Sequence, residues 1–371
     1  MADMIRTVHP VGQGTFISEK FIERNGKETI VVYDCGSQNG KSVIEREICN
    51  SFEKGTEICA VYISHLDNDH VNGLEFLIKH CRVKKVFLPY LSPKSLFMTM
   101  VKYKCETESG ETDLCSELVS DLIYYSHERM SEQFATFKNA DYSNVFPEIY
   151  FVRSNNICVQ NIDTENTDIW KYLAFNNENK KTKKKFFELL ISEGIPEAFA
   201  TDINSFSRLW DNLEYRNILK KIYKKLDGGI NANSLGIVSY PLTNAYKEPI
   251  DYPCLKHKSC IMYSYNKRQD NAGAIYVGDM DLSDTESDFY KTRYKGNQIG
   301  LLQLPHHGSK NSYSTRCTEN IEAFIACAGY ANRYGHPSGF VIDDLLKKRK
   351  ELHTVTEHPG SRYREHIIIE Y

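Results

Sequence analysis

Residues 59–76 read CAVYISHLDNDHVNGLEF, an apolar run that ends in a crowd of ionisable side chains. Two imidazoles and two carboxylates, those of His65, Asp67, Asp69 and His70, follow the apolar run almost without a spacer. Such groups repel or desolvate one another unless a positive charge lies among them. The stretch therefore predicts a buried strand whose end presents a site for a cation.

The composition is that of a globular protein. The 371 residues are 41% hydrophobic and 26% charged with a formal net charge of −3, which suits one large domain or two of ordinary size. The 11 cysteines are odd in number and none lies in a Cys-x-x-Cys pair, which argues against a disulfide framework. Because we find neither a signal-peptide core nor the ~20 apolar residues that span a bilayer, we expect a cytoplasmic protein without a membrane-embedded part.

Strands and helices alternate in the first part of the chain. The β-branched runs at 29–36, 58–64 and 83–89 predict strands. Apolar spacing near 3.6 residues at 42–54 and 72–81 predicts helices. This alternation is typical of an α/β protein.

Residues 93–228 have a different texture, rich in Lys, Glu, Asn and Ser and poor in Gly. Helical spacing recurs at 116–134, 183–194 and 215–226. Alternation of polar and apolar residues at 148–162 predicts one hairpin. We expect a largely helical insertion or subdomain here.

The strand pattern returns after residue 228. Apolar or β-branched runs predict strands at 234–240, 259–265, 273–279, 300–306, 322–328 and 366–371. One α/β unit is therefore expected in two halves, at 1–92 and 229–371, with the insertion at 93–228 between them.

Further polar side chains occur where these later strands end. Asp279 follows one strand, His306 and His307 follow the next, and His336 lies in a later loop. Loops at one edge of a sheet lie side by side, so their side chains can converge on one site. The sequence predicts a metal site built from His65, Asp67, Asp69, His70, Asp279 and His306 or His307.

The types of ligand restrict which metal ion the site can bind. Imidazole nitrogens and carboxylate oxygens at ~2.0–2.2 Å suit Zn²⁺, and a carboxylate-rich set also suits Mn²⁺. Alternate residues of an extended segment point the same way, so the segment 65–70 can serve two neighbouring ions. Taken alone, an Asp-x-Asp is as readily a loop or a helix cap. The succession of such motifs at strand ends favours the metal site.

These motifs resemble the metallo-β-lactamase fold, a four-layer αββα sandwich with a metal site at one edge of its sheets. The signature His-x-His-x-Asp-His corresponds to HLDNDH at 65–70, with Asp67 in place of the second histidine. Asp34 of the YDCG stretch is similar to the residue that supports the metal loop, and Asp279 to the bridging aspartate. The resemblance implies an α/β chain in which this sandwich is interrupted by the helical insertion.

The ordered motifs GQG, DCG, SHLDNDHVNGL, NSLGIV, VGDMD, LPHHGS and RYGHPS are similar to the metal-dependent hydrolase domain of ComEC-type competence proteins and their free-standing relatives. The likeness implies a nuclease or phosphodiesterase that acts on nucleic acid, in which two divalent ions, zinc or manganese, hold the attacking water. The family histidine expected between the metal loop and Asp279 has no clear match. Such relatives also accompany bacterial antiviral defence systems, which makes a regulatory protein partner possible.

The resemblance also suggests roles for single residues. His306 directly follows its strand and is the favoured ligand, with His307 as the second choice or as an acid near the leaving oxygen. His336 binds substrate, protonates a leaving group or caps a turn. The catalytic candidates are Asp69, His307 and His336. The candidates for substrate contact are Asn233, Ser234, Ser309, Lys310 and Arg333.

Two other readings stay open at this stage. The same scaffold can hydrolyse a small ester, lactone, thioester or cyclic nucleotide, or serve as a non-catalytic scaffold, because a fold does not set the function. The lysine-rich clusters at 180–185, 220–225 and 347–350 are either solvated helix faces or contacts to a polynucleotide. A groove lined with lysine or arginine favours the nuclease, and a closed pocket favours a small substrate.

Overall fold

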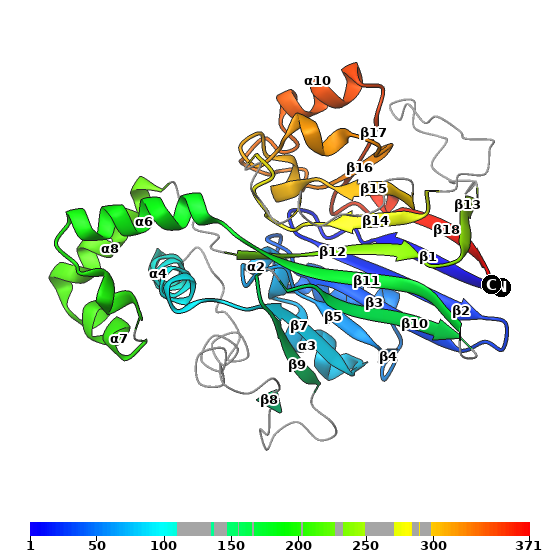
Figure 1. Ribbon diagram of the computed structural model, residues 1–371, viewed down its shortest axis with the longest axis horizontal. Coiled ribbons are helices and arrows are strands. Elements are labelled where there is room, and N and C mark those ends of the chain that lie inside the picture. The colour runs from blue at the N-terminus through cyan, green and yellow to red at the C-terminus, as the bar shows by residue number, and fades with distance from the viewer. Residues whose placement is uncertain are drawn as a thin grey trace.

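The computed structural model describes residues 1–109, 135–136, 147–154, 156–164, 167–201, 203–226, 233–248, 271–283, 289 and 298–371. The helix expected at 116–134 and the strand expected at 259–265 lie outside these ranges. Within them, two large sheets pack face to face and a group of helices extends from one end of the sandwich (Figure 1).

The larger sheet brings the carboxyl ends of several strands to one edge. Its strand order is β13 (Asn244–Glu248), β18 (Tyr363–Glu370), β1 (Ala2–Val8), β2 (Phe16–Glu23), β3 (Glu28–Cys35), β5 (Ala60–Tyr62), β7 (Lys85–Pro89), β9 (Glu148–Val152) and β8 (Ala135–Thr136). β3, β5, β7 and β9 pair in parallel. Loops that follow parallel strands meet at the same edge of a sheet, and the HLDNDH segment is the loop after β5.

The smaller sheet repeats this arrangement. Its strand order is β10 (Cys158–Thr164), β11 (Thr167–Glu178), β12 (Asn233–Pro241), β14 (Gly273–Tyr276), β15 (Ile299–Gln303), β16 (Ala323–Cys327) and β17 (Glu351–Val355). The strands from β14 to β17 pair in parallel, so the loops that carry Asp279, His307 and His336 leave the sheet at one edge. A separate two-stranded sheet joins β4 (Glu57–Ile58) to β6 (Arg82–Val83).

Helices cover the outer face of each sheet. On the larger sheet, α1 (Lys41–Ser51) packs Ile44 and Ile48, one turn apart, into a core shared with Leu77 of α3 (Leu74–His80). On the smaller sheet, α10 (Gly339–Lys347) packs Val341 and Leu345 in the same way. A third core fills the space between the sheets. These layers form the αββα sandwich predicted from the sequence.

A helical subdomain has a core of its own. It contains α4 (Pro93–Ser109), α6 (Lys180–Ser192), η1 (Glu197–Thr201), α7 (Ile203–Asp211) and α8 (Leu213–Lys225). Phe97, Phe186, Phe206 and Trp210 pack together at its centre. The helices predicted at 183–194 and 215–226 are therefore observed as α6 and α8. Among the described residues, no helix is long and apolar enough to cross a membrane.

The hairpin predicted at 148–162 is wrong. β9 pairs with β7 in the larger sheet, whereas β10 pairs with β11 in the smaller sheet. The alternation correctly predicts two strands, but these strands pair within different sheets. The region 93–228 thus supplies strands to both sheets and also forms the helical subdomain. In the chain, α4 of this subdomain follows β7, and α6 to α8 lie between β11 and β12.

A buried ionic network lies between the two sheets. Arg6 on β1, whose side chain is 0% exposed, pairs with Glu19 on β2 at 2.7 Å and also with Glu365 on β18. Lys247 on β13 pairs with Glu365 at 2.5 Å. Burial opposes ionisation of Glu365, but the charges of Lys247 and Arg6 outweigh it and lower the pKa of this carboxyl to about 2. Glu365 therefore contributes stability at neutral pH that is lost as the pH falls from its ordinary pKa toward about 2.

Glu365→Gln is expected to lower the free energy of unfolding by about 3 kcal/mol at pH 7, because it leaves buried cations short of a partner. At pH 3 this carboxyl is protonated in the unfolded parent but still ionised in the folded one, so the difference between the two proteins should shrink by about 2 kcal/mol between pH 7 and pH 3. Urea unfolding at the two pH values measures it. The control is Glu28→Gln, whose carboxylate is 43% exposed. A difference that stays constant with pH would contradict the role of the network.

Candidate metal centre

Asp34 at the end of β3 holds the loop that follows β5. Its Oδ1 accepts the backbone N–H of Ser64 at 2.6 Å and its Oδ2 accepts the Ser64 hydroxyl at 2.8 Å. Asp34 is fully buried and has a φ of 55°, in the left-handed region that aspartate tolerates better than most residues. Because β3 and β5 are parallel neighbours, their ends are close enough for these bonds.

Two glycines allow the loops of the site to approach one another. A Cβ on Gly36 would lie 2.3 Å from the backbone nitrogen of His70 and 2.4 Å from the carbonyl carbon of Asp69. A Cβ on Gly278, whose φ is 54°, would lie 2.5 Å from the Cβ of Ser64. The glycines of DCG and VGD are therefore needed for backbone packing at the site.

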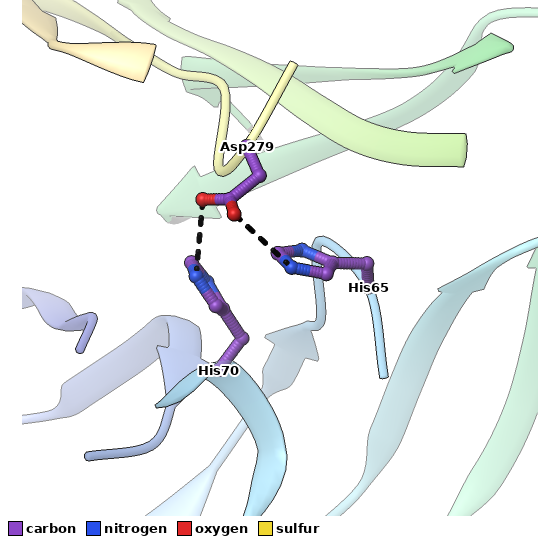
Figure 2. A group of neighbouring side chains, drawn as sticks. All are labelled: His65, His70 and Asp279. Carbon is purple, nitrogen blue, oxygen red and sulfur yellow. Dashed lines mark ion pairs between the residues drawn. The ribbon is translucent and has the colours of Figure 1, made fainter. Parts of the chain in front are cut away.

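His70 directs a ring nitrogen into the site (Figure 2). Its Nδ1 lies 2.7 Å from Oδ2 of Asp34, which accepts, so Nδ1 carries the proton and Nε2 keeps its lone pair. That Nε2 lies 3.3 Å from Oδ1 of Asp279 and 3.7 Å from Oδ2 of Asp69. It is buried and has no hydrogen-bond partner in the described part of the chain. A buried lone pair that faces two carboxylates is unfavourable unless a proton or a metal ion lies between them.

His307 presents a second such nitrogen. Its Nδ1 donates to the carbonyl of Cys327 at 2.7 Å, which leaves Nε2 facing Oδ2 of Asp69 at 3.0 Å. The turn that produces this orientation is strained, because His306 and His307 both have positive φ values, 48° and 57°. Each such residue costs about 1–3 kcal/mol and is found mainly at functional sites. The backbone N–H of His306 donates to the carbonyl of Gly278 at 3.0 Å and joins this turn to the Asp279 loop.

The charges around His70 and Asp279 favour a positive charge between these side chains. Burial lowers the pKa of His70, but the carboxylates of Asp69, Asp34 and Asp279 outweigh it and raise that pKa well above the usual value. Burial raises the pKa of Asp279, but His306, His70 and His65 outweigh it and lower that pKa. A proton on His70 satisfies this demand in the metal-free protein, and a metal ion would replace it.

The spacing of the donor atoms fits one ion. Ligand atoms of Asp69, His70 and His307 lie within 4.8 Å of one another, and Oδ1 of Asp279 lies 3.3 Å from His70 and 3.9 Å from His307. Tetrahedral bonds of ~2.0–2.2 Å place ligand atoms ~3.3–3.6 Å apart. We call Asp69, His70, His307 and Asp279 the inner group. The sequence favoured His306 as the ligand, whereas in the structure His307 is the histidine whose fixed nitrogen points at the other donors of this group.

The remaining predicted ligands lie on the other side of Asp279. Its Oδ2 lies 3.7 Å from Nε2 of His65 and 3.6 Å from Nε2 of His306, whose side chain is 39% exposed. Asp67 places Oδ2 3.3 Å from Nε2 of His65. Asp67 is the residue before α2 (Asn68–Val71), yet its side chain makes no capping hydrogen bond to that helix. We call His65, Asp67 and His306 the outer group.

The helical subdomain contributes residues that sequence reasoning missed. Lys102 on α4 forms an ion pair with Oδ2 of Asp67 and lies 3.9 Å from Glu106 one turn later. The Tyr223 hydroxyl of α8 donates to Glu106 at 2.9 Å. Burial raises the pKa of Glu106 to about 7. A lysine and a glutamate on a polar helix carry no local signal of such a role, because only the packing of α4 brings them to the site.

The predicted substrate contacts divide into two kinds. Asn233 and Ser234 are buried and hydrogen-bond within the protein, Asn233 to Asn176 at 3.0 Å and Ser234 to the carbonyl of Val277 at 2.9 Å. They support strands and do not belong to either group of ligands. Ser309 is also buried. Lys310 and Arg333 are exposed outside both groups.

His336 lies at the edge of the site. Its ring centroid is 5.6 Å from that of His306 and 6.4 Å from that of His307. Burial and these two imidazoles lower the pKa of His336 to about 4, which leaves it neutral near pH 7. Its backbone N–H donates to Oδ1 of Asn332 at 2.8 Å, so the loop is held by Asn332 and the ring stays available.

Comparison with known proteins gives one match in sequence and weak ones in structure. A model of the Metallo-beta-lactamase superfamily matches residues 21–89, which contain β3 and the HLDNDH segment. No curated protein matches the chain. The sandwich layers and the match at 21–89 confirm the predicted fold class.

Two solved structures show a weak likeness to this chain. A long form RNase Z from yeast is 10% identical at a TM-score of 0.31, with 82% of this chain and 32% of that chain covered. This chain therefore spans about a third of the RNase Z. The Zn(2+)-bound PqqB from Methylobacterium extorquens is 10% identical at a TM-score of 0.34, with 98% of this chain and 99% of that chain covered.

His307→Ala is expected to lower the Zn²⁺ affinity by more than ~100-fold, because it removes a ligand and not an outer hydrogen-bond partner, whose loss typically costs ~10–100-fold. His306→Ala should lower it by less than ~10-fold, since that ring is partly exposed and outside the inner group. Competition with a chromophoric chelator measures both, with His353→Ala on β17 as the control. A larger loss in His306→Ala than in His307→Ala would reverse the assignment.

Proposed function

We propose that this protein is a metal-dependent hydrolase that cleaves phosphodiester bonds in nucleic acid. The observation that carries the proposal is the inner group, in which a buried His70 nitrogen faces the carboxylates of its chain neighbour Asp69 and of Asp279 on a loop of the other sheet. Such a set of donors suits a divalent cation, and it lies where loops from both sheets meet. The match to the Metallo-beta-lactamase superfamily at 21–89 supports the hydrolase class.

The donor set suits zinc, and its carboxylates also suit manganese. Asp69, His70, His307 and Asp279 would hold the ion, and the sequence predicts a second ion at the outer group. A divalent ion bound there supplies Lewis acidity to a phosphoryl oxygen and lowers the pKa of water. Asp34 and the Cys327 carbonyl fix the tautomers of the two histidines, which keeps both Nε2 atoms available as ligands.

Other side chains of the site can act on the substrate directly. His306 and His336 form the open side, and as neutral rings each can donate one hydrogen bond to a phosphate oxygen or accept a proton from water. Lys102 adds a positive charge beside the outer group, which favours a negatively charged substrate.

The preference for nucleic acid comes from the basic face of α8. A surface hollow on this helix is lined by Asn217, Lys220, Lys221, Lys224 and Lys225. Lys221 and Lys225 also pair with Glu193, at 2.8 and 3.2 Å. Tyr223 of the same helix reaches Glu106 beside Lys102, so the basic face and the metal centre are connected through α4. A row of lysines on the subdomain that contacts the metal centre suits the phosphates of a polynucleotide.

The test is cleavage of single- and double-stranded DNA and RNA with added Zn²⁺, Mn²⁺ or Mg²⁺. Asp69→Ala and Asp279→Ala should each lower cleavage by at least ~1000-fold, because each leaves the ion short of a ligand. The control, Asp343→Ala, removes an exposed aspartate of α10 and should cleave like the parent. Cleavage that survives in both site variants would contradict the proposal.

The salt dependence separates the polymer from a small substrate. Replacing Lys221 and Lys224 by Ala should reduce the slope of log affinity against log salt by ~1–2, whereas replacing the exposed Lys27 and Lys54 should leave it unchanged. Hydrolysis of a small ester or cyclic nucleotide without polymer cleavage would favour the small-molecule alternative. Bound metal without any hydrolysis would favour a scaffold or a missing protein partner.

A further inference from the structure

A positively charged side chain already lies against the outer group. The Nζ atom of Lys102 pairs with Oδ2 of Asp67, and the same oxygen lies 3.3 Å from Nε2 of His65. That oxygen is the atom through which Asp67 would bind an ion together with His65. The ammonium group therefore occupies the place beside Asp67 that the second ion, predicted from the sequence, would need.

Lys102 is held in place and does not merely lie on the surface. Its side chain is 9% exposed. Its neighbours on α4, Met98 and Val101, are buried in the core of the helical subdomain. One turn along α4, Glu106 lies 3.9 Å from Nζ and accepts a hydrogen bond from Tyr223 of α8. Two helices thus position this one positive charge against Asp67.

The donors of the outer group are less well placed for an ion than those of the inner group, because Asp67 is already paired with Lys102 and the His306 side chain is 39% exposed. Apart from Asp67, it offers His65 and the half-exposed His306, together with the second oxygen of Asp279. The histidine expected between the metal loop and Asp279 has no match, and the residues found there, Asn233 and Ser234, bond to other parts of the sheet. A divalent ion at His65 and Asp67 would stand beside an ammonium group in a buried setting, where like charges repel strongly.

We propose that Lys102 takes the place of the second metal ion, so that the protein binds one divalent ion, in the inner group, with the lysine as the other positive charge of the site. Lys102 is then the residue that determines metal number, and the helical subdomain completes the hydrolytic site through it. This inference rests on the metal centre of the proposed function.

The test is the number of ions per chain, measured by native mass spectrometry and elemental analysis after loading with Zn²⁺ alone and with Mn²⁺ alone. The parent should bind one ion. Lys102→Met, which keeps most of the length of the side chain and removes its charge, should bind two, because Asp67 becomes free to ligate. Lys104→Met, on the exposed side of α4, should bind one like the parent.

A second variant covers the case in which Lys102→Met does not fold. Asp67→Asn should still bind one ion, whereas Asp69→Asn should bind none. Two ions in the parent, one ion in a folded Lys102→Met, or loss of the parent's ion in Asp67→Asn would each overturn the role of Lys102. A parent that binds no ion would overturn the metal centre itself, so failure of the proposed function is distinguishable from failure of this inference.

Discussion

The hydrogen bond between His70 and Asp34 is the contact on which the site depends. Both side chains are fully buried, and the bond joins the end of β3 to the loop after β5 at 2.7 Å. It fixes the proton on Nδ1 and leaves a lone pair on Nε2 that faces Asp69 and Asp279. A buried lone pair among carboxylates is unfavourable unless a proton or a metal ion lies beside it, so metal binding can stabilise this arrangement in place of a proton.

The parallel strands of both sheets explain how distant residues meet there. Asp34 lies at the end of its strand, and the HLDNDH loop, Asp279 and His307 follow theirs, and the carboxyl ends of these strands lie at one edge of the sandwich. The backbone is also strained at the metal centre, where Asp34, His306 and His307 have positive φ values. Strain of this kind persists only where the surrounding structure holds it, here through the bond from His306 to the Gly278 carbonyl.

The sequence predicted the features that depend on local pattern and failed where packing between distant elements is decisive. β-branched runs and glycines located β3, β5, β7, β12 and β14 to β16, and the order of the polar motifs located Asp69, His70 and Asp279 at one site. Which histidine of the pair points inward depends on two left-handed residues, which no composition rule indicates. Lys102 was missed because its role follows from how α4 packs, and β9 and β10 alternate like a hairpin although they join different sheets.

X-ray absorption at the zinc edge of the zinc-loaded protein tests the central claim most directly, because it counts the imidazoles bound to the ion. The account predicts two imidazole nitrogens per zinc, from His70 and His307, with the other ligands oxygen at ~2.0–2.2 Å. Loss of one imidazole signal in His307→Ala and none in His306→Ala would identify them. Zinc bound by oxygen alone, or by three or more imidazoles, would contradict the account.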